Sequence, residues 1–196
     1  ASDVYKRQKL CGVESINVHE DIKIGLPTRD KLIEDYCKSL ETVGKAGIHL
    51  VCYNFMPVFD WTRTDLAMPL EDGSTALAYD SSIIDGIDAS EMFDRIEKAS
   101  GGFVMPGWEP NRRDEIMDLF DKYKDVTADK LRENFKYFLD GIMPTCEKYQ
   151  IKMAVHPDDP AWDVFGLPRI VTCEDDLLKI ASLTVSYTHL RAHETG

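Results

Sequence analysis

The chain has 196 residues, of which 43% are apolar, 10% aromatic and 30% charged, a composition typical of a single globular domain. Lys and Arg number 23 against 35 Asp and Glu, giving a formal net charge of -12. Such an acidic surface repels phosphate backbones, so we expect no nucleic-acid partner. No apolar run approaches the ~20 residues that cross a bilayer, and no apolar leader opens the sequence, so we expect no membrane association.

The cysteines indicate a reducing compartment. They are scattered along the chain without a C-x-x-C pair, at Cys11, Cys37, Cys52, Cys146 and Cys173. Because an odd number of unclustered cysteines is typical of reduced thiols, we expect a cytoplasmic protein.

The two ends of the chain resemble translated sequencing adapters. Residues 1–8 (ASDVYKRQ) back-translate to a transposase adapter used for library preparation, and VSYTHLRAHET, which begins at Val185, back-translates to the reverse strand of its partner. We therefore expect residues 1–8 and 185–196 to be adapter-derived, and residues 9–184 to be the genuine protein segment. The histidines that remain for a metal site are His19, His49 and His156.

Strands and helices alternate along residues 9–184. Apolar periodicity predicts, in chain order, a strand at 15–18, a helix at 30–46, a strand at 48–53, an irregular stretch at 54–75, helices at 82–100, 111–124 and 127–149, and a strand at 151–155. The strand at 48–53 is expected to be buried on both faces. A final helix is opened by a Thr172–Asp175 capping box and has Leu177, Leu178 and Ile180 as its apolar positions. Strands separated by helices predict a parallel sheet with both faces covered, an α/β architecture. No G-x-G-x-x-G follows the early strands, so a dinucleotide-binding sheet is not supported. The three strand–helix units fall short of the eight of a (β/α)₈ barrel, which takes typically ~250 residues.

Candidate functional residues follow the predicted strands, because reactive groups gather at the carboxyl ends of parallel strands. The clusters are His19, Glu20 and Asp21 after the first strand, Asn54, Asp60, Trp61, Arg63 and Asp65 after the second, and His156, Asp158 and Asp159 after the third.

His156 is the sharpest candidate in these clusters. A histidine at a strand end, held by the following Pro157, suits a divalent metal, and Asp158 and Asp159 would support it or bind substrate hydroxyls. The alternative is a loop in which proline and aspartate only form turns.

The other clusters leave two interpretations open as well. Arg63 presents a guanidinium fork for a carboxylate or phosphate beside Trp61, or it is a surface arginine paired with Asp60 or Asp65. His19 binds metal or substrate, or it is a hydrogen-bonded structural residue. We expect structural roles for His49, at the start of its strand, and for Cys52, as a small buried apolar side chain.

Long runs of the sequence resemble the mannonate dehydratase family. They are VCYNFMPVFDWTRTDL (residues 51–66) and MAVHPDDPAWDVFGLPRIV (residues 153–171), with GIHL before the first and VHEDIK at 18–23. The resemblance covers essentially all of residues 9–184 and implies that they form a partial (β/α)₈ TIM barrel of the xylose-isomerase-like kind. It also implies dehydration of D-mannonate to 2-keto-3-deoxy-D-gluconate in hexuronate (glucuronate) catabolism, with Mn²⁺ or Fe²⁺ as the metal.

The resemblance assigns roles to single residues. His156 matches the family's first metal-ligand histidine. The other ligands (a Cys, a second His and an Asp) and the catalytic Asp and Tyr belong to later strands that this chain lacks. We therefore expect the fragment itself to be inactive. For the full-length enzyme we expect that a homo-oligomer is possible. Cys173 opens a helix and is not the missing ligand. The predicted substrate contacts are Arg63 to the carboxylate, Asn54, Asp158 and Arg169 to hydroxyls, and Trp61 and His19 beside them.

Two other functions stay open at this point. One is a metal-dependent sugar isomerase or epimerase of the same barrel superfamily, which would leave the elemental composition of its substrate unchanged. The other is a non-catalytic binding domain, which need not retain Mn²⁺ or Fe²⁺.

Overall fold

The structure, a computed structural model, describes residues 10–84, 90–91, 93 and 110–183. The chain divides into two compact units. The first unit comprises residues 1–55, 132–157 and 174–196, and the second comprises residues 56–131 and 158–173. No helix among the described residues is long and apolar enough to cross a membrane.

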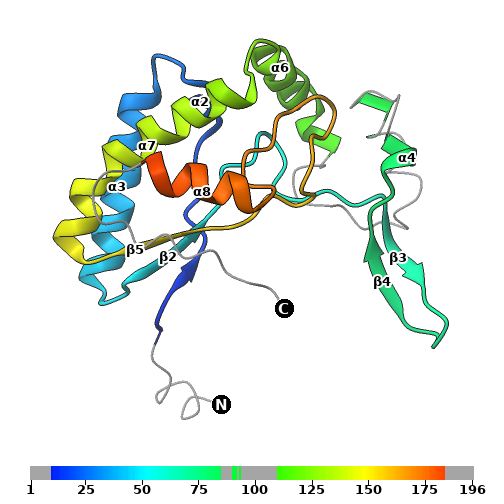
Figure 1. The fold of residues 1–196 in the computed structure, drawn as a ribbon, viewed down its shortest axis with the longest axis horizontal. Coiled ribbons are helices and arrows are strands. Elements are labelled where there is room, and N and C mark those ends of the chain that lie inside the picture. Colours follow the sequence, from blue (N-terminus) through cyan, green and yellow to red (C-terminus); the bar gives the residue numbers. More distant parts are fainter. Residues whose placement is uncertain (1–9, 85–89, 92, 94–109, 184–196) are drawn as a thin grey trace. The chain divides into compact units, whose positions relative to one another are not determined.

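The first unit is built on a parallel sheet of three strands. These are β1 (Val13–Glu14), β2 (Leu50–Tyr53) and β5 (Lys152–Val155), in the spatial order β1-β2-β5 (Figure 1). The expected parallel pairing is confirmed. The expected strand at 15–18 is wrong, because pairing with β2 stops at Glu14. A four-residue alternation of polar and apolar side chains does not distinguish a paired strand from an extended loop.

The first unit also contains four helices, α2 (Glu20–Ile24), α3 (Arg29–Lys45), α7 (Ala128–Tyr149) and α8 (Glu174–Leu183). The first residues of α7 belong to the second unit. Figure 1 shows α3 and α7 side by side. An aromatic core joins them to β2: Tyr53 contacts Phe135 and Phe138 of α7, and Phe138 meets Tyr36 of α3 edge-on with ring centroids 5.0 Å apart. The predicted helices at 30–46 and 127–149 are therefore confirmed.

Strand β2 has one fully buried face and one half-buried face. Val51 and Tyr53 are buried, whereas Leu50 and Cys52 are half-buried. The expectation of a strand buried on both faces is wrong, and so is that of a buried Cys52. The helices cover the face to which Tyr53 points, and a short apolar run does not tell one covered face from two.

Helix α8 corrects two details of the sequence analysis. It begins at Glu174, two residues after Thr172, and the side chain of Leu178 is 62% exposed, although Ile180 is buried. The buried polar residue of α8 is Asp176, which accepts a hydrogen bond from Arg132 of α7 at 3.0 Å. The helix is thus held by an ion pair as well as by apolar contact.

The second unit contains a hairpin that the sequence analysis missed. Strands β3 (Asp65–Pro69) and β4 (Thr75–Ala78) pair antiparallel, and β3 lies within the stretch expected to be irregular, at whose end β4 begins. Gly73 lies in the turn of the hairpin, where it has φ +83° and donates its N–H to the carbonyl of Leu70. Because both strands are largely exposed, they lack the apolar alternation by which a strand is recognised.

The helices of the second unit are α4 (Ser81–Ile84), the 3₁₀ turn η1 (Pro110–Arg112) and α6 (Arg113–Tyr123). The predicted helix at 111–124 is confirmed by η1 and α6. The helix predicted at 82–100 begins as α4, and most of its remaining length lies outside the described residues.

Candidate active site

His156 lies directly after β5, at the carboxyl end of the parallel sheet. Its backbone N–H donates to the carbonyl of Tyr53 at 2.7 Å, so the residue is fixed to the end of β2. Its ring Nδ1 is 2.6 Å from the carbonyl oxygen of Pro157. A carbonyl only accepts, so Nδ1 carries the hydrogen and the lone pair of a neutral ring is on Nε2. This orientation is the one that metal-binding histidines adopt when a carbonyl holds the other nitrogen.

Asn54 lies beside His156 at the same sheet edge. Tyr53 and Val155 are paired in the register of β2 and β5, so the residues that follow them, Asn54 and His156, leave neighbouring strand ends. Both side chains are half-buried. The structure therefore brings together two of the predicted site residues, as expected for carboxyl ends of parallel strands.

Arg63 is bound to a carboxylate of the chain itself. Its Nη1 and Nη2 donate to the two oxygens of Asp159 at 2.9 and 2.7 Å, and Nη1 also donates to the carbonyl of Thr62 at 2.9 Å. The guanidinium carbon lies 5.4 Å from the ring centroid of Trp61. Such a planar, two-point pair is among the stronger protein ion pairs. The expected alternative partners, Asp60 and Asp65, are not the ones the structure shows.

Asp158 is buried and closes the loop in which it lies. One of its oxygens, Oδ2, accepts the backbone N–H groups of Ile170 and Val171 at 2.7 and 2.8 Å, and its own N–H donates to the carbonyl of Val171 at 2.9 Å. Two N–H donors on one carboxylate oxygen hold both chain segments together. Asp158 therefore ties the start of the 158–173 loop to its end.

Arg169 is buried in the second unit, with 3% of its surface exposed. Its Nη1 donates to the carbonyl of Phe59 at 3.1 Å, and its backbone N–H donates to Asp163 at 2.9 Å. Burial lowers the pKa of the guanidinium, while nearby aspartates raise it. Sequence reasoning missed the part played by Asp163, because its partner lies six residues along an irregular loop.

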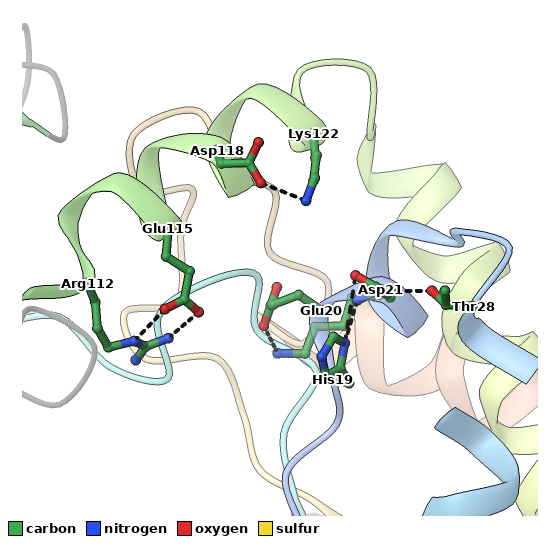
Figure 2. A network of polar contacts seen from close by, with 9 residues as sticks. His19, Glu20, Asp21, Thr28, Arg112, Glu115, Asp118 and Lys122 are labelled. Carbon is green, nitrogen blue, oxygen red and sulfur yellow. Dashed lines mark hydrogen bonds and ion pairs between the residues drawn. The ribbon is translucent and has the colours of Figure 1, made fainter. Parts of the chain in front are cut away.

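His19 precedes helix α2 and caps its amino end. Its Nδ1 accepts the backbone N–H of Asp21 at 3.1 Å, and Asp21 in turn accepts a hydrogen bond from Thr28 (Figure 2). A side-chain acceptor at this position satisfies an N–H group that has no partner within the helix. The structure therefore gives His19 a capping role, and its predicted contact with substrate stays a prediction.

The described residues do not contain a complete metal site. No group of three or more His, Cys, Asp or Glu side chains converges within the part of the chain that the structure describes. His156 fits a divalent metal through its free Nε2, but it would need ligands from outside this set.

Comparison with known proteins places the sequence in one family. The family profile described as D-mannonate dehydratase (UxuA) matches residues 5–189. The chain is 61% identical over 174 residues to a mannonate dehydratase of Brachyspira hyodysenteriae, which covers 89% of this chain and 49% of the relative. It is 51% identical over 172 residues to a mannonate dehydratase of Thermotoga neapolitana, covering 88% of this chain and 48% of that protein.

A solved structure agrees with the sequence comparison. The crystal structure of mannonate dehydratase from Streptococcus suis serotype 2 matches with a TM-score of 0.77 and 43% identity, over 91% of this chain and 45% of that one. The expected fold class, part of a xylose-isomerase-like (β/α)₈ barrel, is thereby confirmed. The chain spans about half the length of the curated relatives it matches. It belongs to the mannonate dehydratase family.

Proposed function

We propose that this chain contributes the metal-binding strand end of an enzyme that dehydrates D-mannonate to 2-keto-3-deoxy-D-gluconate, a carbon–oxygen hydro-lyase of hexuronate catabolism. The observation that carries this proposal is the placement of His156 after β5, with Nδ1 on the Pro157 carbonyl and Nε2 left for a metal. Membership of the mannonate dehydratase family supports the reaction.

His156 would bind Mn²⁺ or Fe²⁺ through Nε2. The bound ion supplies a Lewis acid that stabilises negative charge on substrate oxygens. The contribution of this chain is to fix the ring: the hydrogen bonds from His156 N–H to Tyr53 and from Nδ1 to Pro157 leave it little freedom to turn. The remaining ligands, and the acid and base that move protons, are expected in the part of the relatives' length that this chain does not span.

The substrate contacts proposed for the sugar acid remain Asn54, Trp61, Arg63, Asp158, Arg169 and His19. Asn54 is supported by its place beside His156 at the sheet edge. Asp159 takes the edge of Arg63 formed by its two Nη atoms, so a substrate carboxylate would either replace Asp159 there or meet the Nε side of the guanidinium. Oδ2 of Asp158 already accepts two backbone N–H groups.

The test is an assay on a full-length enzyme, meaning a chain that contains residues 9–184 and continues to the length of its relatives. Incubation with D-mannonate and Mn²⁺ or Fe²⁺ should give a product lighter by one water, measured by mass spectrometry. A product of unchanged mass would identify an isomerase or epimerase instead. A protein that binds sugar acids but gives no product would be a binding domain.

The isolated segment is predicted to be inactive. A sheet of three strands leaves hydrogen-bonding edges unpaired, and such edges favour association with other chains. Residues 9–184 expressed alone should aggregate and give no product in the same assay. A soluble, cooperatively unfolding and active segment would contradict this.

We place the full-length enzyme in the cytoplasm as a possible homo-oligomer. The compartment is supported by the five cysteines, all of which are free thiols in the structure. The two ends, residues 1–8 and 185–196, lie outside the described residues. Their proposed origin as adapter sequence is tested by reading the genomic DNA across both junctions.

A further inference from the structure

The hairpin of the second unit has two outer edges, and that of β3 is blocked. Among the described residues β3 and β4 form a sheet of their own (Figure 1), in which Met68 and Leu70 bond to the β4 side. The alternate residues, Ala67 and Pro69, therefore face outward. The N–H of Ala67 donates to the carboxylate of Asp65 at 2.8 Å, and proline has no N–H. Such features are what keep a β edge from pairing with another chain.

The outer edge of β4 is open. The carbonyl groups of Ser74 and Ala78 accept N–H groups from the β3 side of the hairpin, at 2.9 Å each. Because bonding positions alternate along an antiparallel ladder, the backbone groups of Thr75 and Leu77 face away from β3. These groups make no hydrogen bond to any residue that the structure describes. An edge with free donors and acceptors is a template for a further strand.

The surface of β4 is apolar and uncharged. Its sequence is Thr-Ala-Leu-Ala, and Leu77 is 54% exposed. The carboxylates on either side of the strand are engaged in their own loops: Asp72 accepts from the Ser74 hydroxyl and Asp80 from the Ser82 hydroxyl, both at 2.6 Å. In a chain with a net charge of -12, copies repel one another. The strand β4 is a place where two copies can meet without bringing charged side chains together.

The strand is held in place before any partner arrives. Tyr79, the residue after β4, meets Trp162 of the same unit edge-on, with ring centroids 5.3 Å apart. The next N–H, that of Asp80, donates to Oγ1 of Thr64 at 2.9 Å. Because this end of the strand is already fixed, pairing with a further strand requires little additional ordering.

A second copy of β4 satisfies the open edge. In an antiparallel pair with its two-fold axis at Ala76, Thr75 of each copy lies opposite Leu77 of the other, and the two residues exchange N–H···O bonds in both directions. This register uses both outward-facing residues within the strand itself. We propose that β4 is a dimerisation edge, through which two copies of the full-length enzyme form one continuous antiparallel sheet. The inference rests on the proposed homo-oligomer and not on the proposed reaction.

The test is the mass of the full-length enzyme in sedimentation equilibrium, compared with two proline variants. Leu77→Pro removes an outward N–H of β4 and places a ring against the incoming strand, while the bonds to β3 remain. Ala67→Pro makes the same change on the outer edge of β3 and is the matched control. Leu77→Pro should have half the mass of the unaltered enzyme, and Ala67→Pro should keep the full mass.

Three results would overturn the proposal. The first is an unaltered enzyme that is monomeric, and the second is a loss of mass in both variants. The third is an unchanged mass in Leu77→Pro with a lowered free energy of unfolding, which would show that the remainder of the full-length chain covers β4. A monomeric enzyme that dehydrates D-mannonate would contradict the dimer alone, and a dimer that releases no water would contradict the proposed reaction alone.

A cross-link decides the matter if Leu77→Pro does not fold, as judged by near-ultraviolet circular dichroism. In the proposed register Ala76 lies on the two-fold axis in a non-hydrogen-bonded pair, where the two Cα atoms are about 4.5 Å apart and within disulfide range. Mild oxidation of Ala76→Cys should join two copies of the peptide that contains position 76, as read by mass spectrometry. Ala78→Cys, on the same face, lies opposite Ser74 of the second copy and should give no such link. Absence of the link in Ala76→Cys would overturn the proposal.

Discussion

The ring nitrogen Nδ1 of His156 lies 2.6 Å from the carbonyl oxygen of Pro157, the next residue in the chain. This contact selects the form of the ring in which Nε2 keeps its lone pair. The ring is also attached to the sheet, since the N–H of His156 donates to Tyr53 at the end of β2. The candidate metal ligand is therefore oriented by the backbone carbonyls of Tyr53 and Pro157.

The Arg63–Asp159 pair should stabilise the full-length enzyme. Arg63→Ala and Asp159→Ala should each lower the free energy of unfolding, and a double-mutant cycle should give a coupling of about 1 kcal/mol, because the pair is two-pointed but partly solvent-exposed. Urea unfolding of the four proteins measures it. A coupling near zero would contradict this prediction.

Two buried tyrosines should respond differently to loss of their hydroxyl groups. The Tyr53 hydroxyl is buried without a hydrogen bond to any described residue, so Tyr53→Phe should leave the free energy of unfolding unchanged or raise it. The Tyr36 hydroxyl donates to the carbonyl of Ile16 at 3.2 Å, so Tyr36→Phe should cost about 1 kcal/mol. Urea midpoints of the full-length variants measure both. A larger loss in Tyr53→Phe than in Tyr36→Phe would contradict this assignment.

His19 should act through helix α2. His19→Ala removes the acceptor for the Asp21 N–H and should lower the free energy of unfolding by about 1 kcal/mol, whereas His19→Asn keeps a capping side chain and should recover most of it. The KM for D-mannonate should rise in His19→Ala, because His19 is also a proposed substrate contact. An unchanged stability would contradict the capping role, and an unchanged KM would contradict the substrate contact.

The cysteines should differ in reactivity. Burial raises the pKa of the Cys146 thiol to about 12, so this thiol stays protonated and unreactive near neutral pH, where the thiolate is the nucleophile. The exposed Cys11 and Cys173 should react with iodoacetamide in the folded protein, and Cys146 only after unfolding. Mass spectrometry of the labelled peptides measures this, and labelling of native Cys146 at the rate of Cys173 would contradict it.

The same shift has a consequence for stability at high pH. The ordinary pKa of a cysteine, 9.0, applies to the unfolded chain, and the folded value is about 12. Between these values the unfolded chain loses the proton while the folded protein keeps it. Raising the pH through this window therefore favours unfolding, and the stability contributed by the buried thiol is complete only below about pH 9.

Helical periodicity predicted α3, α6 and α7 because these helices each bury a face, with Tyr36, Ile116 and Phe138 among the buried residues. The hairpin β3–β4 was not predictable in this way, because its strands are largely exposed and bury no regular face. The apolar periodicity of a segment identifies an element that buries one face against a neighbour. It does not identify an element that buries neither of its faces.

The candidate site was also predictable from the sequence only in part. His156 was identified from a local signal, a histidine followed by a proline at the end of an apolar strand. The partner of Arg63 was not, because Asp159 lies 96 residues away in the sequence and two other aspartates are much closer. Which carboxylate meets a given arginine depends on how loops pack, and spacing along the chain carries no information about it.

The metal content of His156→Ala in the full-length enzyme tests the central claim most directly, with His49→Ala as the control. His49 is an exposed histidine of the same unit whose Nδ1 contacts the Tyr149 carbonyl at 3.1 Å, so its removal should leave the metal in place. Purified enzyme should contain Mn²⁺ or Fe²⁺, and His156→Ala should lose the ion and its turnover, because removing a ligand costs more than the 10–100-fold in affinity that removing its supporting partner typically does. A His156→Ala enzyme that keeps a stoichiometric ion and dehydrates D-mannonate at the unaltered rate would contradict the account.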